Sequence, residues 1–90
     1  MKEIECIITG KVQGVGYRDF VMRHARALWL TGVVKNVKPG TVTVIAQGPE
    51  DKLSRFIEHL RKGPFLARVR DVEVMWREPQ DNFKDFSILF

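Results

Sequence analysis

The sequence contains a single cysteine, no long apolar run and no low-complexity stretch, and each absence excludes a class of protein. One cysteine cannot form an internal disulfide, and no His/Cys cluster has the spacing of a zinc site. No segment approaches the roughly 18 consecutive apolar residues that a membrane-spanning helix needs. The first residues, 1–6, include no apolar stretch typical of a signal peptide. We therefore expect a cytoplasmic domain without disulfide, metal or other cofactor.

The composition is that of an ordinary globular domain. Hydrophobic residues make up 44% of the chain and charged residues 29%, which excludes a disordered tail. Residues 1–90 suffice for one small domain, with an expected radius of gyration of about 12 Å. The formal net charge of +4 favours anionic partners such as phosphates, carboxylates or nucleic acid. Acidic residues are interspersed among the basic ones, so there is no polybasic tail.

The hydrophobic period changes several times along the chain. Alternation predicts strands, and apolar spacings of three and four predict helices. The expected strands cover residues 4–12, 32–37, 41–47, 68–77 and 86–90. One helix is expected over residues 19–29, and a second opens within residues 48–51 and stops within 61–64. This β-α-β-β-α-β order with a terminal strand predicts an α+β fold, the ferredoxin-like α/β sandwich, in which an antiparallel sheet carries both helices on one face.

A glycine-rich segment separates the first expected strand from the first expected helix. Gly14 and Gly16 permit sharp turns that bring backbone N–H groups to a common point. The helix that follows adds its own unsatisfied N–H groups and its positive dipole end. Arg18, where loop becomes helix, carries a planar fork of donors suited to phosphate. These features are typical of an anion cradle, although a plain glycine-rich turn with a surface arginine is equally compatible with them.

Residues 12–18 read Val-Gln-Gly-Val-Gly-Tyr-Arg and resemble the signature of the acylphosphatase family. Residues 32–42, Gly-x-Val-Lys-Asn-x-x-x-Gly-x-Val, resemble its second signature. Segments 63–69 and 86–88 extend the similarity over the whole chain. The resemblance implies a small ferredoxin-like enzyme that hydrolyses acyl phosphates to a carboxylate and inorganic phosphate, without a metal.

The resemblance also implies a role for individual residues. It makes Arg18 the phosphate-binding cation and Asn36 the residue that holds the attacking water. Carboxylate is a good leaving group, so the site has only to neutralise charge on the phosphoryl oxygens and to align water. Thr41 adds a hydroxyl near Asn36 or faces solvent. The substrate-binding loop implied by the resemblance consists of Gln13, Gly14, Val15, Gly16, Tyr17 and Arg18.

Two residues depart from the family pattern. Val33 stands where an aromatic residue is usual, which predicts a smaller wall beside Asn36. Trp29 stands where the helix usually ends with glycine. If the left-handed cap is kept there, a bulky residue costs on the order of 1 kcal/mol.

Other residues are expected to be structural. Cys6 has the parity of core residues, which predicts a buried thiol. His24 and His59 lie on helices without metal partners in the sequence pattern, and structural or surface roles are expected for both. Trp76 and the terminal phenylalanines at 86 and 90 are expected in the core.

Taken together, the sequence predicts a cytoplasmic, monomeric acylphosphatase acting on small acyl phosphates, with inorganic phosphate as product and no nucleic-acid or membrane partner. One alternative is a binding module that holds carbamoyl phosphate or phosphate without efficient turnover, as at the front of hydrogenase-maturation proteins. A second alternative is an RNA-recognition domain, which shares the element order. Such a domain stacks bases on aromatic residues of its central strands, and the strand at 41–47 has none.

Overall fold

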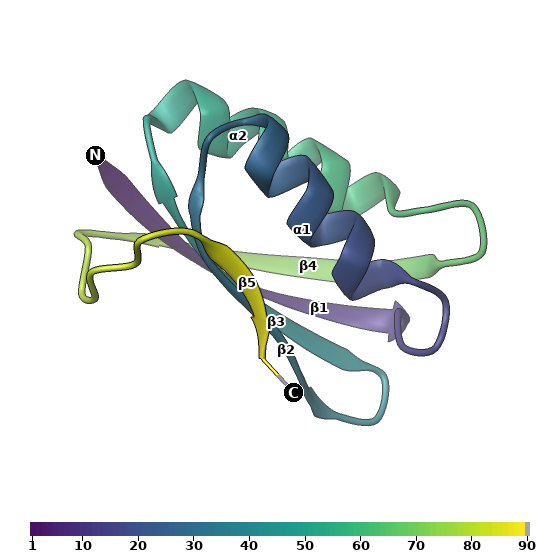
Figure 1. The fold of residues 1–90 in the computed structure, drawn as a ribbon. Helices are drawn as coiled ribbons and strands as arrows, with labels where there is room; N and C mark the ends of the chain where they lie inside the picture. Colours follow the sequence, from purple (N-terminus) through teal and green to yellow (C-terminus); the bar gives the residue numbers. More distant parts are fainter. Residues whose placement is uncertain (90) are drawn as a thin grey trace.

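The computed structural model describes residues 1–89 and places a sheet of five strands beneath two helices (Figure 1). Both helices lie on the same face of the sheet, so the predicted ferredoxin-like fold is confirmed. The radius of gyration is 11.7 Å. Neither helix within residues 1–89 is long and apolar enough to cross a membrane. The elements are β1 (Lys2–Lys11), α1 (Tyr17–Ala27), β2 (Thr31–Lys38), β3 (Thr41–Gly48), α2 (Glu50–Lys62), β4 (Arg68–Arg77) and β5 (Phe86–Leu89).

The sheet has the strand order β4-β1-β3-β2-β5. The first four strands in the chain pair antiparallel, as predicted. The last strand pairs parallel with β2, so the complete sheet is mixed, and this pairing was not predicted. Phe90, which the prediction included in the last strand, lies outside the described residues.

The core lies between the sheet and the helices. In β1, Ile4, Cys6 and Ile8 alternate toward the helices, and all three are fully buried. Cys6 is therefore buried as predicted, and burial raises the pKa of its thiol to about 12. The apolar stripe of α2 is buried as its helical spacing requires. Phe86 of β5 also reaches this core, with 1% of its surface exposed.

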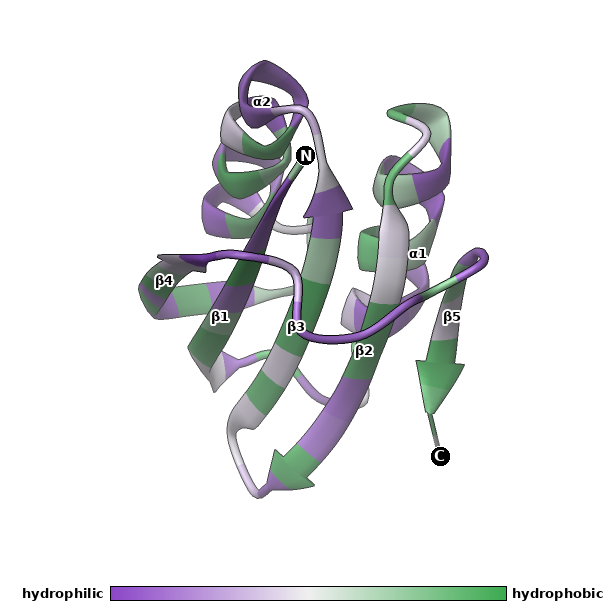
Figure 2. Ribbon diagram, turned by 90° about the vertical axis from the view of Figure 1, so that its left-hand side faces the viewer, coloured by the Kyte–Doolittle hydropathy of each residue, from purple (hydrophilic) through white to green (hydrophobic). Residues whose placement is uncertain are grey.

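The other face of the sheet carries no helix, and the chain between β4 and β5 crosses it. Figure 2 shows this segment, residues 78–85, running over the sheet on the side away from the helices. Beneath it the buried side chains of Glu3 and Gln47 hydrogen-bond to each other, 2.7 Å apart. Glu3 also accepts from the backbone N–H of Gln80, and Gln47 donates to the carbonyl of Asp81. The crossing segment, which we call the strap, is thus held to the sheet by buried polar groups.

The first helix is displaced by two residues at each end from its expected range of 19–29. It begins at Tyr17, directly after Gly16, and ends at Ala27. Trp29 follows with a φ of 59°, so the left-handed position usually held by glycine is kept by a bulky residue. The expected cost is about 1 kcal/mol. With 84% of its surface exposed, the indole recovers little of that cost through burial.

Candidate active site

The loop between β1 and α1 turns on two left-handed glycines. Gly14 has a φ of 71° and Gly16 a φ of 75°, while the residues between and beside them have negative φ. Such alternation turns successive N–H groups toward one side and creates a concavity for an anion. A Cβ at either glycine would meet nothing within 4 Å. Backbone conformation, not space, therefore requires glycine at both positions.

The N-terminus of α1 faces the same concavity. Gly16 is its N-cap residue and, having no side chain, provides no side-chain cap for the N–H groups of the first turn. The N–H of Phe20 is bonded to the carbonyl of Gly16 at 3.0 Å, so the helical ladder starts there. The earlier N–H groups and the positive helix end favour a bound anion. Arg18, half-buried in this first turn, adds a guanidinium.

A cavity of about 190 Å³ occupies the concavity. Five of the six residues expected to bind substrate line it, and only Val15 does not, because its side chain packs toward the core. Sequence reasoning missed three lining residues. The residues that line the cavity are Val12, Gln13, Gly14, Gly16, Tyr17, Arg18, Asp19 and Ile88.

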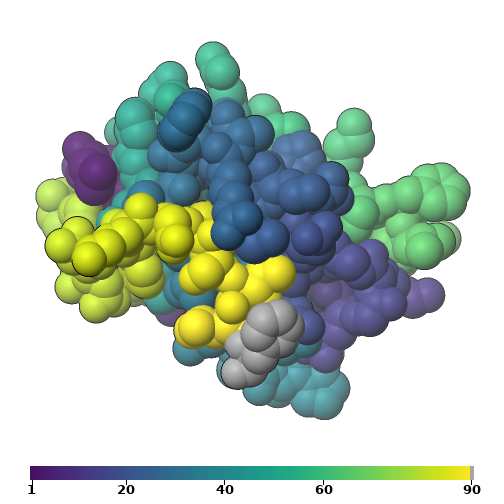
Figure 3. All heavy atoms as spheres, viewed as in Figure 1, coloured from purple at the N-terminus to yellow at the C-terminus, as the bar shows by residue number. Residues whose placement is uncertain are grey.

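Ile88 is the lining residue most distant in sequence from the loop. It comes from β5, and Figure 3 shows the surface of this strand lying directly against α1. The sequence marked Ile88 by its place in an alternating apolar pattern and in the segment 86–88 that resembles the family, but neither signal reveals the neighbours of the strand. Its place in the site follows from the parallel pairing of β5 with β2.

The side chain of Gln13 is used within the protein. Its amide nitrogen donates to the carbonyl of Lys38 at 2.7 Å and to the carbonyl of Thr41 at 2.9 Å. Both donors of the amide group are thus occupied. The side chain joins the loop between β1 and α1 to the β2–β3 turn, so its amide hydrogens are engaged within the protein.

Tyr17 anchors the beginning of α1. Its ring is 1% exposed, and its hydroxyl donates to the carbonyl of Leu60 at 2.8 Å. Burial raises the pKa of this phenol well above its ordinary value of 10. The hydroxyl is therefore a neutral structural donor that links α1 to α2, and it is unsuited to acid catalysis.

Asn36 lies on the helix-facing side of the sheet, near the end of β2. It pairs with Val42 of β3 and shares its side with Val34, which is buried under the helices. Val34 in turn pairs with the cavity-lining Ile88. Asn36 is exposed and lies two residues after Val34 along β2. It is not one of the residues that line the cavity.

Two expectations about the surroundings of Asn36 are wrong. Thr41 does not face solvent, since it is 6% exposed, and its pairing partner on β2 is Lys38. Val33 pairs with Ile45 on the side of the sheet away from the helices. It therefore forms no wall beside Asn36, and its departure from the family pattern affects the strap side instead.

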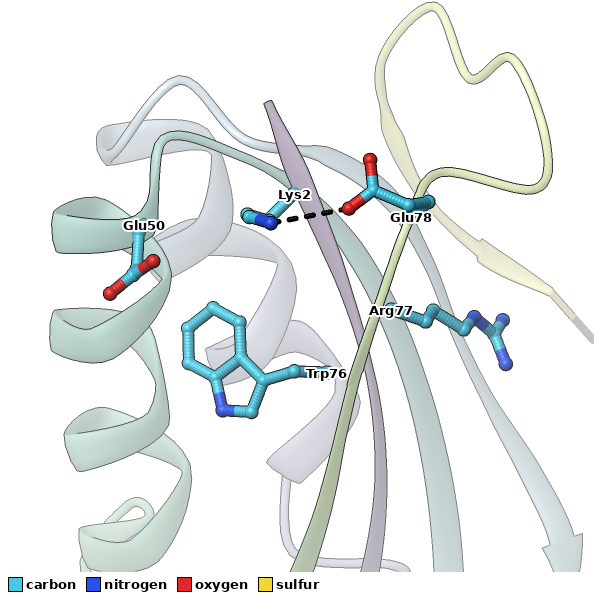
Figure 4. Close-up of a pocket in the computed structure, with 5 residues that line it drawn as sticks. All are labelled: Lys2, Glu50, Trp76, Arg77 and Glu78. Carbon is cyan, nitrogen blue, oxygen red and sulfur yellow. Dashed lines mark hydrogen bonds and ion pairs between the residues drawn. The ribbon is translucent and has the colours of Figure 1, made fainter.

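A larger cavity of about 380 Å³ lies at the other end of β1 (Figure 4). Trp76 lies between α2 and β1 there and is 42% exposed, so its expected place in the core is wrong. Lys2 pairs with Glu78 at 3.2 Å, Glu50 stands on the first turn of α2, and Arg77 points away from them. Two carboxylates and a lysine already paired with one of them disfavour the binding of a phosphate group at this cavity. The smaller cavity at the glycine loop is the better candidate site.

The fold and this site together define a small α+β domain with a cavity between its first strand and first helix, lined by left-handed glycines and a helix N-terminus. The sequence model of the family described as Acylphosphatase matches residues 4–88. An acylphosphatase from Thermus thermophilus is 46% identical over 88 residues, which cover 98% of this chain and 99% of that protein. The chain belongs to the acylphosphatase family, whose activity is the hydrolysis of acyl phosphates.

Solved structures agree with this assignment. The crystal structure of acylphosphatase from Bacillus subtilis is 37% identical, has a TM-score of 0.96 and covers the whole of both chains. Full-length HypF, in a phosphate- and nucleotide-bound form, is 32% identical with a TM-score of 0.87. That match covers all of this chain and 12% of HypF.

Proposed function

We propose that the glycine loop and Arg18 hold the phosphoryl group of an acyl phosphate while Asn36 holds the water that attacks it. The observation that carries this proposal is the cavity of about 190 Å³ in which left-handed glycines, an uncapped helix N-terminus and an arginine converge. Backbone N–H groups and a guanidinium fork are donors that stabilise charge on phosphoryl oxygens.

The proposed reaction needs positioning and charge stabilisation more than a strong nucleophile. The water oxygen forms a bond to phosphorus while the bond between phosphorus and the acyl oxygen breaks. The carboxylate leaves with the electron pair, and the proton of the water passes to a phosphoryl oxygen of the substrate. Asn36, a neutral amide, accepts a hydrogen bond from the water through Oδ1 and orients it. No resident metal or cofactor enters this scheme.

The proposed substrates are small acyl phosphates such as acetyl phosphate, carbamoyl phosphate and 1,3-bisphosphoglycerate, because the cradle recognises their shared phosphate end. We further propose that the protein acts as a monomer in the cytoplasm and without nucleic-acid or membrane partners.

Arg18→Ala tests the cradle. Hydrolysis of benzoyl phosphate is measured for the wild type and this variant in the presence of a chelator. Wild-type activity is expected to survive the chelator, and Arg18→Ala should lower kcat/KM by about 10²–10³-fold, the usual effect of one charge-stabilising donor. Arg18→Lys should restore activity only in part, because an ammonium lacks the planar fork. Arg55→Ala removes an exposed positive charge from α2 and serves as the control.

Two results would contradict the assignment. If Arg18→Ala retained more than about a tenth of wild-type kcat/KM, the loss would be far smaller than removal of a phosphate-binding arginine should cause. Activity lost to the chelator and restored by added metal would overturn the metal-independent scheme.

The same assay separates the proposed roles of Arg18 and Asn36. Asn36→Ala should lower kcat by about 10²-fold and leave competitive inhibition by inorganic phosphate close to wild type, since the resting complex does not depend on the water. Arg18→Ala should weaken that inhibition strongly. If both variants weakened it equally, Asn36 would be a second phosphate ligand. Circular dichroism first establishes that each variant is folded.

The alternative of a binding module is favoured by one observation, the similarity to a small part of the much longer HypF. A module of that kind would bind inorganic phosphate and release none from benzoyl phosphate. The wild-type turnover measured above therefore decides between the two functions.

A further inference from the structure

We infer that Gln13 is a positioning residue that sets the distance between the phosphate loop and the strand end that carries Asn36. This inference rests on the proposed function. It assigns the side chain of Gln13 a role other than ligand, because its amide donors are directed at the protein and away from the cradle.

The first step is the pair of hydrogen bonds at the Gln13 side chain. Its Nε2 bridges two carbonyls of one turn, those of Lys38 at 2.7 Å and Thr41 at 2.9 Å. An amide with both hydrogens engaged by fixed acceptors has one orientation. The bond to Thr41 is partly buried, so water competes less for it than at an exposed site, whereas the bond to Lys38 is exposed.

The second step is the irregularity of the strand pair at this turn. The β2–β3 register shifts between Asn36 and Lys38, so the regular ladder does not fix the last residues of β2. One further backbone bond, from the N–H of Gly10 to the carbonyl of Gly40 at 3.1 Å, ties the turn to the end of β1. Gln13 thus adds a side-chain link from the loop itself to this turn.

The third step is the short path from the turn to Asn36. Lys38, whose carbonyl Gln13 holds, lies two residues after Asn36 on the same strand. Gly14, the first left-handed glycine of the cradle, directly follows Gln13. A change in the side chain of Gln13 therefore moves the phosphate loop relative to the proposed water-holding residue. Misplacement by about 1 Å can cost 10²-fold in rate.

Two substitutions remove the donors and keep the size of the side chain. Gln13→Met has no polar hydrogen, and Gln13→Glu places a carboxylate against two carbonyls. We expect each to lower kcat for benzoyl phosphate by about 10-fold or more. Competitive inhibition by inorganic phosphate should stay within about threefold of wild type, because a positioning defect acts on kcat rather than on ground-state binding.

A double-mutant cycle tests the coupling to Asn36. If Gln13 acts through Asn36, then adding Gln13→Met to Asn36→Ala should lower kcat by no more than about twofold, far less than Gln13→Met alone. The control is Arg26→Gln, which removes another bond between a side chain and a backbone carbonyl, that of Arg26 Nε to Phe86 at 3.1 Å. The fold-changes in kcat caused by Arg26→Gln and by Asn36→Ala should multiply in the double variant.

The outcomes separate this inference from the proposed function. Multiplicative effects of Gln13→Met and Asn36→Ala, or phosphate inhibition weakened as much as kcat falls, would overturn the role of Gln13 and leave the proposed function standing. An Asn36→Ala variant with wild-type kcat would instead overturn the water-holding role. Circular dichroism confirms folding, and if Gln13→Glu fails to fold, Gln13→Met carries the test.

Discussion

Ile88 provides the apolar part of the candidate site. Val12 and Tyr17 also line the cavity, but each is only 1% exposed and offers almost no surface to a ligand. Ile88 is half-buried and packs against the core, so its position is fixed while part of its surface faces the cavity. If the glycine loop binds the phosphate end of an acyl phosphate, as proposed, the acyl group lies within this small cavity or at its mouth.

Ile88→Ala should therefore alter substrate preference. We expect kcat/KM for benzoyl phosphate to fall about threefold to tenfold more than kcat/KM for acetyl phosphate, since the larger apolar acyl group loses more contact. Ile45→Ala, a half-buried isoleucine on the other face of β3, is the matched control and should leave the ratio unchanged. Equal losses on the two substrates would show that the acyl group does not touch Ile88.

For single residues, the sequence predicted the turn at Gly14 and Gly16 and the place of Arg18 at the helix start, because these features are local. Gly14, Gly16 and Arg18 lie within five consecutive residues, and the spacing alone indicates a turn followed by a helix start. The bonds of the Gln13 side chain could not be predicted, because their acceptors are 25 and 28 residues away. Long-range partners of this kind depend on how the sheet is assembled.

Between the helices, three aromatic rings are in contact, with His24 tilted against Phe20 and stacked on His59. Phe20 and His24 of α1 have centroids 4.3 Å apart, and His24 and His59 of α2 are 4.0 Å apart. Burial lowers the pKa of His24 below its ordinary value of 6.5, and the neighbouring His59 and Arg23 lower it further. On α2, Arg55 and Lys62 lie four residues before and three residues after His59, so this part of the helix carries further cations.

The stability of the protein should fall as the pH drops through the mildly acidic range. Because the folded-state pKa of His24 is below 6.5, the unfolded chain binds the proton first. The contribution of neutral His24 to the free energy of unfolding is complete above about pH 6.5. It is lost as the pH falls through the lower folded-state pKa. Urea unfolding at pH 7 and pH 5 measures this loss. His24→Phe keeps the ring stack without the titrating group and should show a smaller decrease.

A decrease of the same size in His24→Phe would place the titrating group elsewhere. The contact between α1 and α2 helps to hold α1 in place, and the first turn of α1 lines the cavity of the candidate site.

The elements themselves were predicted unevenly, and the reasons are physical. β4 has the predicted bounds of 68–77 because alternation and turn residues delimit it. α1 starts at Tyr17, two residues early, because Gly16 supplies the cap conformation without a side-chain signal. The parallel pairing of β5 could not be read from its alternation, because orientation depends on the path of the strap.

Over the whole molecule, the strap determines where β5 enters the sheet. It leaves β4 at one edge, crosses the face without helices and delivers β5 to the opposite edge (Figure 2). The N–H of Gly32 in β2 bonds to the carbonyl of Asp85 at 2.9 Å, so the end of the strap is fixed next to β2. Ile88 follows three residues later and reaches the cavity. The buried polar groups under the strap thus help to fix the path along which the chain reaches β5.

Glu3 is the centre of these groups. Its side chain is fully buried, and Arg77 and Gln47 donate to its carboxylate. Burial favours the neutral acid, but the hydrogen bonds from Gln47, Arg77 and the backbone of Gln80 outweigh it, so the pKa of Glu3 lies below its ordinary 4.5. In the folded protein the carboxylate therefore remains charged at neutral pH, and removing its charge leaves the guanidinium of Arg77 short of a partner.

Glu3→Gln should lower the free energy of unfolding at pH 7 by about 2 kcal/mol. This is less than the ~3–5 kcal/mol of a fully buried broken pair, because the Arg77 side chain is 19% exposed and also contacts Glu5 at 3.3 Å.

Since the pKa of Glu3 is lower in the folded state, its contribution to the free energy of unfolding is complete above about pH 4.5 and is lost as the pH falls below that value. The difference between wild type and variant in urea unfolding should then narrow from pH 7 to pH 3.5, while the histidine contribution, common to both proteins, cancels. A difference that stayed constant with pH would mean that Glu3 stabilises the strap by shape alone.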